Sequence, residues 1–130
     1  MKKVIAFTIA PMLLLLSACG GSSVKVNNLN ADGFASDIKN PGVVVLDVRS
    51  AAEYASGHIE GAINIDVEAA NFDTKIAKLD KTVEYAVYCH SGRRSAIAAD
   101  KMSGANFEKI TNLEGGIQAW QAAGFPLVFA

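Results

Sequence analysis

Apolar runs and amphipathic stretches alternate along most of this chain of 130 residues. Continuous apolar runs rich in β-branched and aromatic residues predict buried strands at 43–46 and 85–88. Shorter runs predict strands at 24–26, 62–65 and 109–112. Because helical patterns separate these runs, we expect an α/β fold, an open and mainly parallel sheet with helices on both faces.

Helix signals lie between the predicted strands. Asn30 or Asp32 can cap a helix that ends near Lys39, and Ser50 with Glu53 has the spacing of a capping box for a short helix to Ala55. The remaining predicted helices cover 67–79, with Ile76 and Leu79 on one face, a small-residue stretch at 95–102, and a last helix from Gly115-Gly116 to Ala123.

The N-terminal residues have the build of a secretory signal. Lys2 and Lys3 precede an apolar run at 4–16, which is too short to span a bilayer comfortably. The sequence Leu-Ser-Ala-Cys that ends at Cys19 resembles the lipobox of bacterial lipoproteins. The alternative is an ordinary signal that is cut nearby and leaves Cys19 free.

The lipobox resemblance implies a division of the chain into three parts. We expect residues 1–18 to be a signal peptide that is removed, 19–29 a lipidated cysteine with a flexible tether, and 30–130 one folded domain. Lipidation of Cys19 would anchor the protein to a membrane in the cell envelope, facing the periplasm. Gly20 follows the cysteine in place of a retaining aspartate, which favours the outer membrane.

Length and charge limit the function further. Cleavage before Cys19 would leave 112 residues, enough for one domain with its own core, and a net charge of −3. Such a chain offers no basic stripe for nucleic acid, so Arg93 and Arg94 stand out against an acidic background. With Cys19 lipidated, Cys89 has no disulfide partner in its own chain, which favours a chemical role for its thiol.

Cys89 opens a loop that reads Cys-His-Ser-Gly-Arg-Arg between a predicted strand and a helical stretch beginning at Ser95. The carboxyl ends of strands are where open α/β sheets bind ligands. The N–H groups of such a turn and the following helix N-terminus favour anions, and therefore a thiolate over a thiol. We interpret Cys89 as a nucleophile in an anion-binding loop; the alternative is a buried, inert cysteine.

Three segments together resemble the rhodanese-homology domain of single-domain sulfurtransferases. The first is Leu-Asp-Val-Arg-Ser at 46–50, together with the stretch that follows it to Ile65. The second is the loop from Cys89 to Arg94, which fits the family pattern C-x-x-G-x-R. The third is Leu-Glu-Gly-Gly at 113–116, together with the stretch that follows it to Pro126. The resemblance covers essentially the whole mature chain. As a secreted or anchored single-domain form, the chain is similar to the phage-shock type of thiosulfate sulfurtransferase.

The resemblance implies transfer of sulfane sulfur. Cys89 would take the outer sulfur of thiosulfate, release sulfite and hold a persulfide, which a thiophilic acceptor such as cyanide or a thiol then removes. We therefore expect the protein to bind a small-molecule sulfur donor and acceptor, and a membrane through Cys19. We expect it not to bind nucleic acid, and the question of a protein partner stays open. No metal or other cofactor is implied, because no second cysteine or histidine cluster lies nearby.

Individual residues receive roles of different kinds. Arg94 is assigned to gripping a sulfonate or to fixing the loop, and Arg93 to attracting anions from an exposed position. His90, Ser91, Gly92 and Ser95 complete the active-site loop, with backbone amides that matter more than side chains, and we give His90 no general-base role. Asp47 and Arg49 are expected to tie neighbouring loops together, His58 to pack and hydrogen-bond, and Trp120 to lie in the core.

Other functions remain open at this point. Phosphatases and arsenate reductases also use a cysteine and an arginine in an anion-binding loop. In the phosphatases that share this fold, however, the loop is one residue longer than the six residues from Cys89 to Arg94. Those phosphatases also usually have a histidine at the position of Tyr88. A persulfide carrier that needs a partner protein is a second alternative. A third, an inactive domain kept for protein contacts, is disfavoured by the intact loop. The sequence names neither the physiological donor nor the acceptor.

Overall fold

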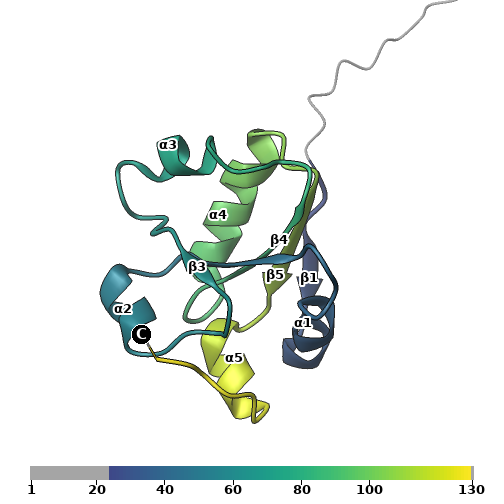
Figure 1. The fold of residues 1–130 in the computed structure, drawn as a ribbon, viewed down its shortest axis with the longest axis vertical. Coiled ribbons are helices and arrows are strands. Elements are labelled where there is room, and N and C mark those ends of the chain that lie inside the picture. Colours follow the sequence, from purple (N-terminus) through teal and green to yellow (C-terminus); the bar gives the residue numbers. More distant parts are fainter. Residues whose placement is uncertain (1–23, 130) are drawn as a thin grey trace, which may run out of the picture.

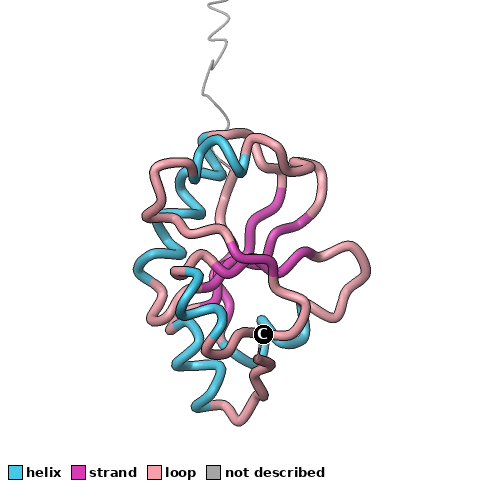
Figure 2. Tube along the Cα trace, turned by 60° about the vertical axis from the view of Figure 1, so that its left-hand side comes forward, coloured by secondary structure: helices cyan, strands magenta, loops and turns pink. Residues whose placement is uncertain are grey.

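The computed structural model of the chain describes residues 24–129, which form one sheet with helices around it (Figure 1). The strands are β1 (Asn27–Leu29), β2 (Val44–Asp47), β3 (Ile63–Asn64), β4 (Glu84–Tyr88) and β5 (Lys109–Leu113). All neighbouring strands pair in parallel, in the order β1-β5-β4-β2-β3. Figure 2 shows the strands at the centre of the molecule, with helices and loops around them.

Helices cover both faces of the sheet. They are α1 (Ala31–Asp37), α2 (Ala51–Ala55), α3 (Phe72–Ile76), α4 (Arg93–Gly104) and α5 (Gly116–Ala122). One core packs Phe72 of α3 and Met102 of α4 against the sheet, and a second core packs Phe34 of α1 and Trp120 of α5 against the other face. Strand β4, at the middle of the sheet, is buried along its whole length. The expected α/β fold with helices on both faces is confirmed.

Several local predictions are also confirmed. The Asn30 side chain accepts the Gly33 N–H and caps α1, and Ser50 and Glu53 form both halves of a capping box at α2. His58 is buried, stacks on the Tyr54 ring and places Nδ1 2.9 Å from the Tyr54 carbonyl oxygen. Trp120 is buried and donates from Nε1 to the Pro126 carbonyl.

Two elements differ from the sequence-based prediction near the N-terminus and in the middle of the chain. The edge strand is β1 at 27–29 and not 24–26, because residues 27–29 are the ones that pair with Thr111–Leu113 of β5. The strand therefore precedes residue 30, where we placed the start of the domain. The long helix expected at 67–79 is reduced to α3, since Asp66 accepts the Glu68 N–H through its side chain and closes a turn instead.

The helix after Cys89 also differs from the prediction. It begins at Arg93, two residues before the expected start at Ser95, so both arginines lie in the first turn of α4. The cause is Gly92, whose φ of +104° lets the chain turn from the loop directly into the helix.

The described residues include no helix that is long and apolar enough to cross a membrane. Cys19 and the predicted signal peptide at 1–18 lie outside the described residues.

The sheet brings two predicted site segments together. Asp47 at the end of β2 is directly opposite Tyr88 at the end of β4, and the Val48 N–H donates to the Tyr88 carbonyl. The segment containing Arg49 and the loop that begins at Cys89 therefore leave the sheet side by side at its carboxyl edge.

Candidate active site at the carboxyl edge of the sheet

Cys89 is a free cysteine that directly follows β4 and is only 1% exposed. Its Sγ accepts a hydrogen bond from the Gly92 N–H at 3.0 Å and lies 3.4 Å from Ser95 Oγ. Burial acts to raise the pKa of the thiol, but a hydrogen bond between the sulfur and the Ser95 hydroxyl, together with the N–H groups of Ser95, Gly92 and Ser91, outweighs it. The pKa of Cys89 therefore lies below its ordinary value, which favours the reactive thiolate.

Helix α5 fixes the direction of the loop's peptide groups. The Ile117 N–H donates to the Cys89 carbonyl oxygen at 2.9 Å, so this carbonyl points toward α5. Gly116 makes the approach possible, because a Cβ there would lie 2.5 Å from the carbonyl carbon and oxygen of His90. With carbonyl groups held by α5, the N–H groups of the loop are free to converge on the sulfur.

Arg94 forms a bidentate ion pair with Glu53 of α2. Its Nη1 and Nη2 lie 2.7 and 2.8 Å from the two carboxylate oxygens of Glu53. The ion pair with Arg94 is the main reason that the pKa of Glu53 falls to about 2, with a further contribution from Ser50. Two roles were considered for Arg94, gripping a sulfonate and fixing the loop. The contact with Glu53 corresponds to the second role, because it ties the first turn of α4 to α2.

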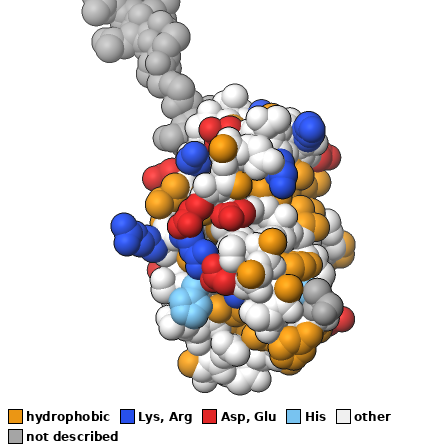
Figure 3. All heavy atoms as spheres, turned by 90° about the vertical axis from the view of Figure 1, so that its left-hand side faces the viewer, with side chains coloured by type: hydrophobic (Ala, Val, Ile, Leu, Met, Phe, Trp, Pro, Cys, Tyr) orange, Lys and Arg blue, Asp and Glu red, His pale blue; other side chains and the backbone are white. Residues whose placement is uncertain are grey.

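The remaining loop side chains face outward. His90, Ser91 and Arg93 are exposed, as expected for His90 and Arg93, whereas Ser95 is fully buried beneath the sulfur. Figure 3 shows the face of the molecule that carries α2 and α3, where basic and acidic side chains lie close together beside a histidine. The ion pairs of the described residues do not include Arg93, so its charge is available to attract anions.

Asp47 and Arg49 form a buried ion pair below the loop. The Arg49 Nη2 lies 2.7 Å from Asp47 Oδ2 and donates also to the Gly57 carbonyl at 2.7 Å. Asn64 donates to the carbonyls of both Asp47 and Arg49, so the pair joins three segments, as predicted. The ion pair is 0–5% exposed at its side chains, which makes its loss costly for the fold.

Sequence reasoning missed the part that Tyr88 and Glu53 play here. The Tyr88 hydroxyl donates to Asp47 Oδ2 at 2.7 Å and accepts the Ile59 N–H at 3.0 Å, and burial together with the Asp47 charge raises the pKa of Tyr88. The sequence gives Glu53 a place in the first family-like segment and in a capping box, but no partner in the Cys89 loop. Its position could have indicated a role in the site, because Glu53 follows Arg49 by about one helical turn at the carboxyl edge of the sheet.

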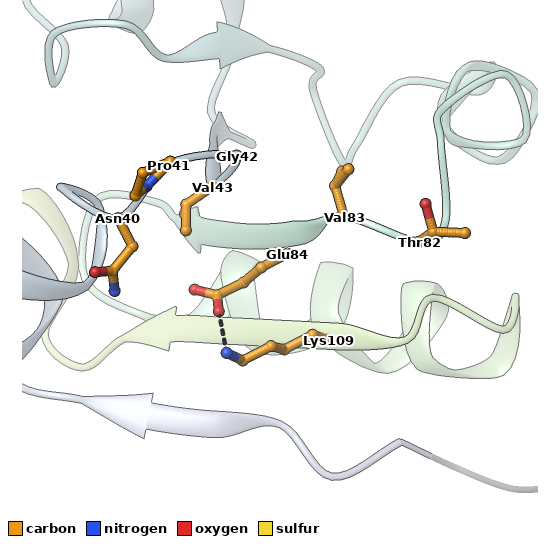
Figure 4. A pocket seen from close by; sticks show the side chains of 8 residues that line it. All are labelled: Asn40, Pro41, Gly42, Val43, Thr82, Val83, Glu84 and Lys109. Atoms are coloured by element: carbon orange, nitrogen blue, oxygen red, sulfur yellow. Dashed lines mark ion pairs between the residues drawn. The ribbon is translucent and has the colours of Figure 1, made fainter.

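Two pockets lie at opposite edges of the sheet. A pocket of about 330 Å³ adjoins the Cys89 loop and α5, and we call it the α5 pocket; its walls include Arg49, Glu53, His90, Ile117, Gln121 and Leu127. A larger pocket of about 460 Å³ lies at the start of β4 and β5, where Glu84 and Lys109 form an ion pair (Figure 4). This larger pocket is far from the Cys89 loop, because it lies at the amino ends of β4 and β5, whereas the loop lies at the carboxyl end of β4. Among residues 24–129, no three His, Cys, Asp or Glu side chains gather as a metal site.

Comparison with known proteins identifies the family. Residues 30–123 match the family model of the rhodanese-like domain. The chain belongs to the rhodanese-like family. The crystal structure of a rhodanese-related protein from Thermoplasma volcanium is similar, with a TM-score of 0.71 and 36% identity over 80% of this chain and 99% of that one. This likeness agrees with the five-stranded parallel sheet described above.

Curated rhodanese-like relatives have names that concern sulfur. The thiosulfate sulfurtransferase GlpE of Ectopseudomonas mendocina is 33% identical over 92 residues, which cover 71% of this chain and 82% of GlpE. YrkF of Bacillus subtilis, named as a candidate sulfur carrier protein, is 36% identical over 76 residues. That match covers 58% of this chain but only 40% of YrkF, so this chain spans less than half the length of that relative.

Proposed function

We propose that this rhodanese-like chain is a thiosulfate sulfurtransferase with Cys89 as its nucleophile. The Cys89 thiolate would attack the outer sulfur of thiosulfate, forming a bond between the two sulfurs while the S–S bond of thiosulfate breaks and sulfite leaves with its electron pair. A thiophilic acceptor such as cyanide or a thiol would then take the sulfane sulfur and return the thiolate. Family membership and relatives named as sulfurtransferases and as a sulfur carrier support sulfur transfer as the general chemistry.

One observation carries the proposal: loop donors converge on the Cys89 sulfur. The Gly92 N–H and the Ser95 hydroxyl contact Sγ, and the pKa of the thiol is lowered even though it is buried. Thiosulfate, the thiolate and the persulfide are all anionic, so the same donors would stabilise each of them. In this account His90, Ser91 and Arg93 form the outer surface of the loop, Arg94 fixes it through Glu53, and Asp47 with Arg49 supports it from below.

Thiocyanate production tests the enzymatic proposal. The chain carrying Cys19→Ser keeps Cys89 as its only cysteine. We expect it to form thiocyanate catalytically from thiosulfate and cyanide, and the same chain with Cys89→Ser to form none above the uncatalysed rate. Equal rates from the two proteins would contradict the role of Cys89.

A persulfide carrier is the second candidate, and the likeness to YrkF is the observation that favours it. A carrier would load one sulfur from a donor and release it slowly to small molecules, but rapidly to a partner protein. If one sulfur is loaded per protein but each protein completes no more than a few turnovers with cyanide, the carrier function is favoured over the enzymatic function. Catalytic turnover on thiosulfate and cyanide alone would exclude it.

We also propose that the protein is a lipoprotein of the cell envelope, of the phage-shock type, anchored through Cys19 and facing the periplasm from the outer membrane. The support is the Leu-Ser-Ala-Cys sequence at the end of an apolar run, with Gly20 after it. In cells given radiolabelled palmitate, the wild-type chain should become labelled and Cys19→Ser should not. Equal labelling of the two, or a wild-type chain found only in soluble fractions, would contradict the anchor.

A further inference from the structure

The lysines of the described residues gather at the end of the molecule opposite the Cys89 loop. All three arginines lie at the carboxyl edge of the sheet, after β2 or in the first turn of α4. The seven lysines of residues 24–129 instead lie in α3, in the last turn of α4, or where the chain enters a strand. Five of them surround α3, the end of α4 and the segments before β1 and β4. We call these five the lysine face: Lys25, Lys75, Lys78, Lys81 and Lys101.

Contacts between these segments place them at one end of the domain. The Ser103 hydroxyl, in the last turn of α4, donates to the carbonyl of Val24 at 2.9 Å, so the segment before β1 lies beside the end of α4. Lys101 Nζ of α4 lies 3.5 Å from Asp73 Oδ1 of α3. Figure 1 shows α3, the end of α4 and the start of β1 together at one end of the molecule, with α2 and α5 at the other.

The lysine face also has an apolar part. A third pocket, of about 330 Å³, lies between α3 and the end of α4, and its walls include Ile76, Ala77, Ala105, Lys81 and Lys101. Lysine side chains can lie along apolar surface with their methylene groups while the ammonium group reaches outward. A surface that is apolar at its centre and cationic around it suits the headgroup region of a lipid bilayer.

Charge is distributed unevenly between the lysine face and the rest of the domain. Of its five lysines, only Lys101 belongs to a described ion pair. The acidic side chains of the same segments number one fewer than these lysines: Asp73, Asp80, Asp100 and Glu108. The rest of the described domain carries five basic side chains against nine acidic ones. An anionic surface would therefore attract the lysine face and repel the remainder.

The proposed lipid anchor would join the domain at the lysine face. Val24 is the first described residue, and only five residue steps separate it from Cys19, which span at most ~18 Å when fully extended. Helix α4, with 12 residues, is itself about 18 Å long and runs from the Cys89 loop to the lysine face. A tether of this length keeps the lysine face closer to the lipid than the Cys89 loop.

We propose that the lysine face lies against anionic lipid headgroups and that the Cys89 loop therefore faces away from the membrane. This rests on the proposed lipid anchor at Cys19. Because the anchor supplies proximity, the charge asymmetry needs only to orient the domain and not to capture it from solution. The ammonium groups would contact headgroup phosphates. Cys89 would stay open to soluble anions such as thiosulfate, which an anionic membrane surface repels.

Lysine footprinting on vesicles tests this orientation. The chain from Cys19 to Ala130 contains every described residue, and with Cys89→Ser its only cysteine is Cys19. It would be coupled through Cys19 to a maleimide lipid in vesicles of phosphatidylcholine alone, or of phosphatidylcholine with about 30% phosphatidylglycerol. The lysines would be acetylated to less than one acetyl group per chain and read by mass spectrometry. We expect Lys78, Lys81 and Lys101 to react about threefold more slowly on the anionic vesicles, and the difference to vanish in about 0.5 M NaCl.

Two variants with equal net charge separate the lysine face from general charge. Lys75→Gln/Lys78→Gln removes two positive charges from the face, at exposed positions outside the described ion pairs. Gln118→Glu/Gln121→Glu makes the same change in net charge at exposed positions of α5, at the other end of the domain. The protection of the remaining lysines should fall by about half or more in the first variant and persist in the second. If both variants lose it equally, net charge and not the lysine face is responsible, and the proposal is wrong.

Other results would also overturn the proposal. Equal acetylation on the two kinds of vesicle would show that the lysine face does not contact the lipid. Slower modification of Arg93 by phenylglyoxal on the anionic vesicles, without protection of the lysines, would place the Cys89 end against the membrane. The coupling is chemical and does not depend on lipidation in cells. If radiolabelled palmitate fails to label the wild-type chain, the anchor at Cys19 falls while the vesicle measurement still decides whether the lysine face binds lipid.

Discussion

At the scale of single residues, burial and hydrogen bonding act in opposite directions on the Cys89 thiol. The thiol of a cysteine that is only 1% exposed would ordinarily stay protonated, because desolvation disfavours the charged form. Donors from the loop and from Ser95 reverse that preference. The reactive state of Cys89 therefore depends on a small number of hydrogen bonds that can be removed one at a time.

Ser95→Ala removes the hydroxyl that lies 3.4 Å from Sγ, which accepts from the thiol and can donate to the thiolate, so the thiolate should become harder to form. The pH midpoint of alkylation of Cys89 by a small electrophile should rise by about one pH unit, since a hydrogen bond to a charged group contributes ~1.5–3 kcal/mol and one unit corresponds to ~1.4 kcal/mol. Ser103→Ala is the matched control, because Ser103 is a buried serine of the same helix that donates to the Val24 carbonyl instead. Equal midpoints for Ser95→Ala and the starting protein would contradict the role of Ser95.

Residue roles could be predicted only where the partners are close in sequence. The capping box of Ser50 and Glu53 spans three residues, and its spacing identified it. The ion pair of Glu53 with Arg94 and the hydrogen bond of Tyr88 to Asp47 each join residues 41 apart. Those contacts depend on which strands become neighbours in the sheet, so no local pattern indicates them.

At the scale of elements, the N-terminus of α5 shapes the Cys89 loop. Gly116 has a φ of +61° and leaves no space for a Cβ beside the His90 carbonyl. The contact links the last helix to the Cys89 loop, although the two are separated in sequence by α4 and β5. A change at Gly116 should therefore affect both the stability of the fold and the geometry of the loop.

Gly116→Ala should destabilise the protein by about 2 kcal/mol or more, from a positive φ and a carbonyl group that must move. It should also lower the rate of persulfide formation. Gly104→Ala, at the end of α4 with open space around it, is the control and should change stability by less than about 1 kcal/mol. Denaturant unfolding measures both variants. A Gly116→Ala variant as stable as Gly104→Ala would show that α5 does not constrain the loop.

Elements with strong local signals were predicted well, and those set by tertiary contacts were not. The buried strands β2 and β4 follow from continuous apolar runs, and α1 from its Asn30 cap. The position of β1 depends on its pairing with β5, and the short α3 depends on a turn made by Asp66 that competes with helix formation. The early start of α4 depends on the backbone conformation of Gly92.

At the scale of the whole molecule, the two edges of the sheet carry different electrostatic environments. The carboxyl edge holds two ion pairs near Cys89, Asp47 with Arg49 and Glu53 with Arg94, beside the exposed Arg93, whereas the opposite edge holds two carboxyl groups close together, Asp37 and Glu84. Asp37 Oδ2 is buried without a hydrogen bond from the described residues, while Glu84 pairs with Lys109 (Figure 4). Burial, and then the neighbouring Glu84 carboxylate, raise the pKa of Asp37 to about 6.

Asp37→Asn should stabilise the protein at neutral pH. Because the folded state holds the proton of Asp37 more tightly than the unfolded chain, this group's contribution to stability is full at low pH and is lost as the pH rises through about 6. The variant should unfold with a free energy ~1–3 kcal/mol above the starting protein at pH 7.5, and the difference should shrink toward pH 4. The control is Asp100→Asn, which makes the same change in charge at an exposed aspartate outside the described ion pairs. A pH-independent difference for Asp37→Asn would contradict this account.

The most direct test of the central claim is the intact mass of the protein after exposure to thiosulfate. The Cys19→Ser chain should gain the mass of one sulfur atom, lose it when cyanide is added, and gain nothing when Cys89→Ser is introduced as well. Such a result would establish a persulfide on Cys89 as the intermediate of sulfur transfer. If the chain with Cys89 intact gains no sulfur, or if the Cys89→Ser chain gains as much, thiosulfate is not its donor or Cys89 is not its nucleophile.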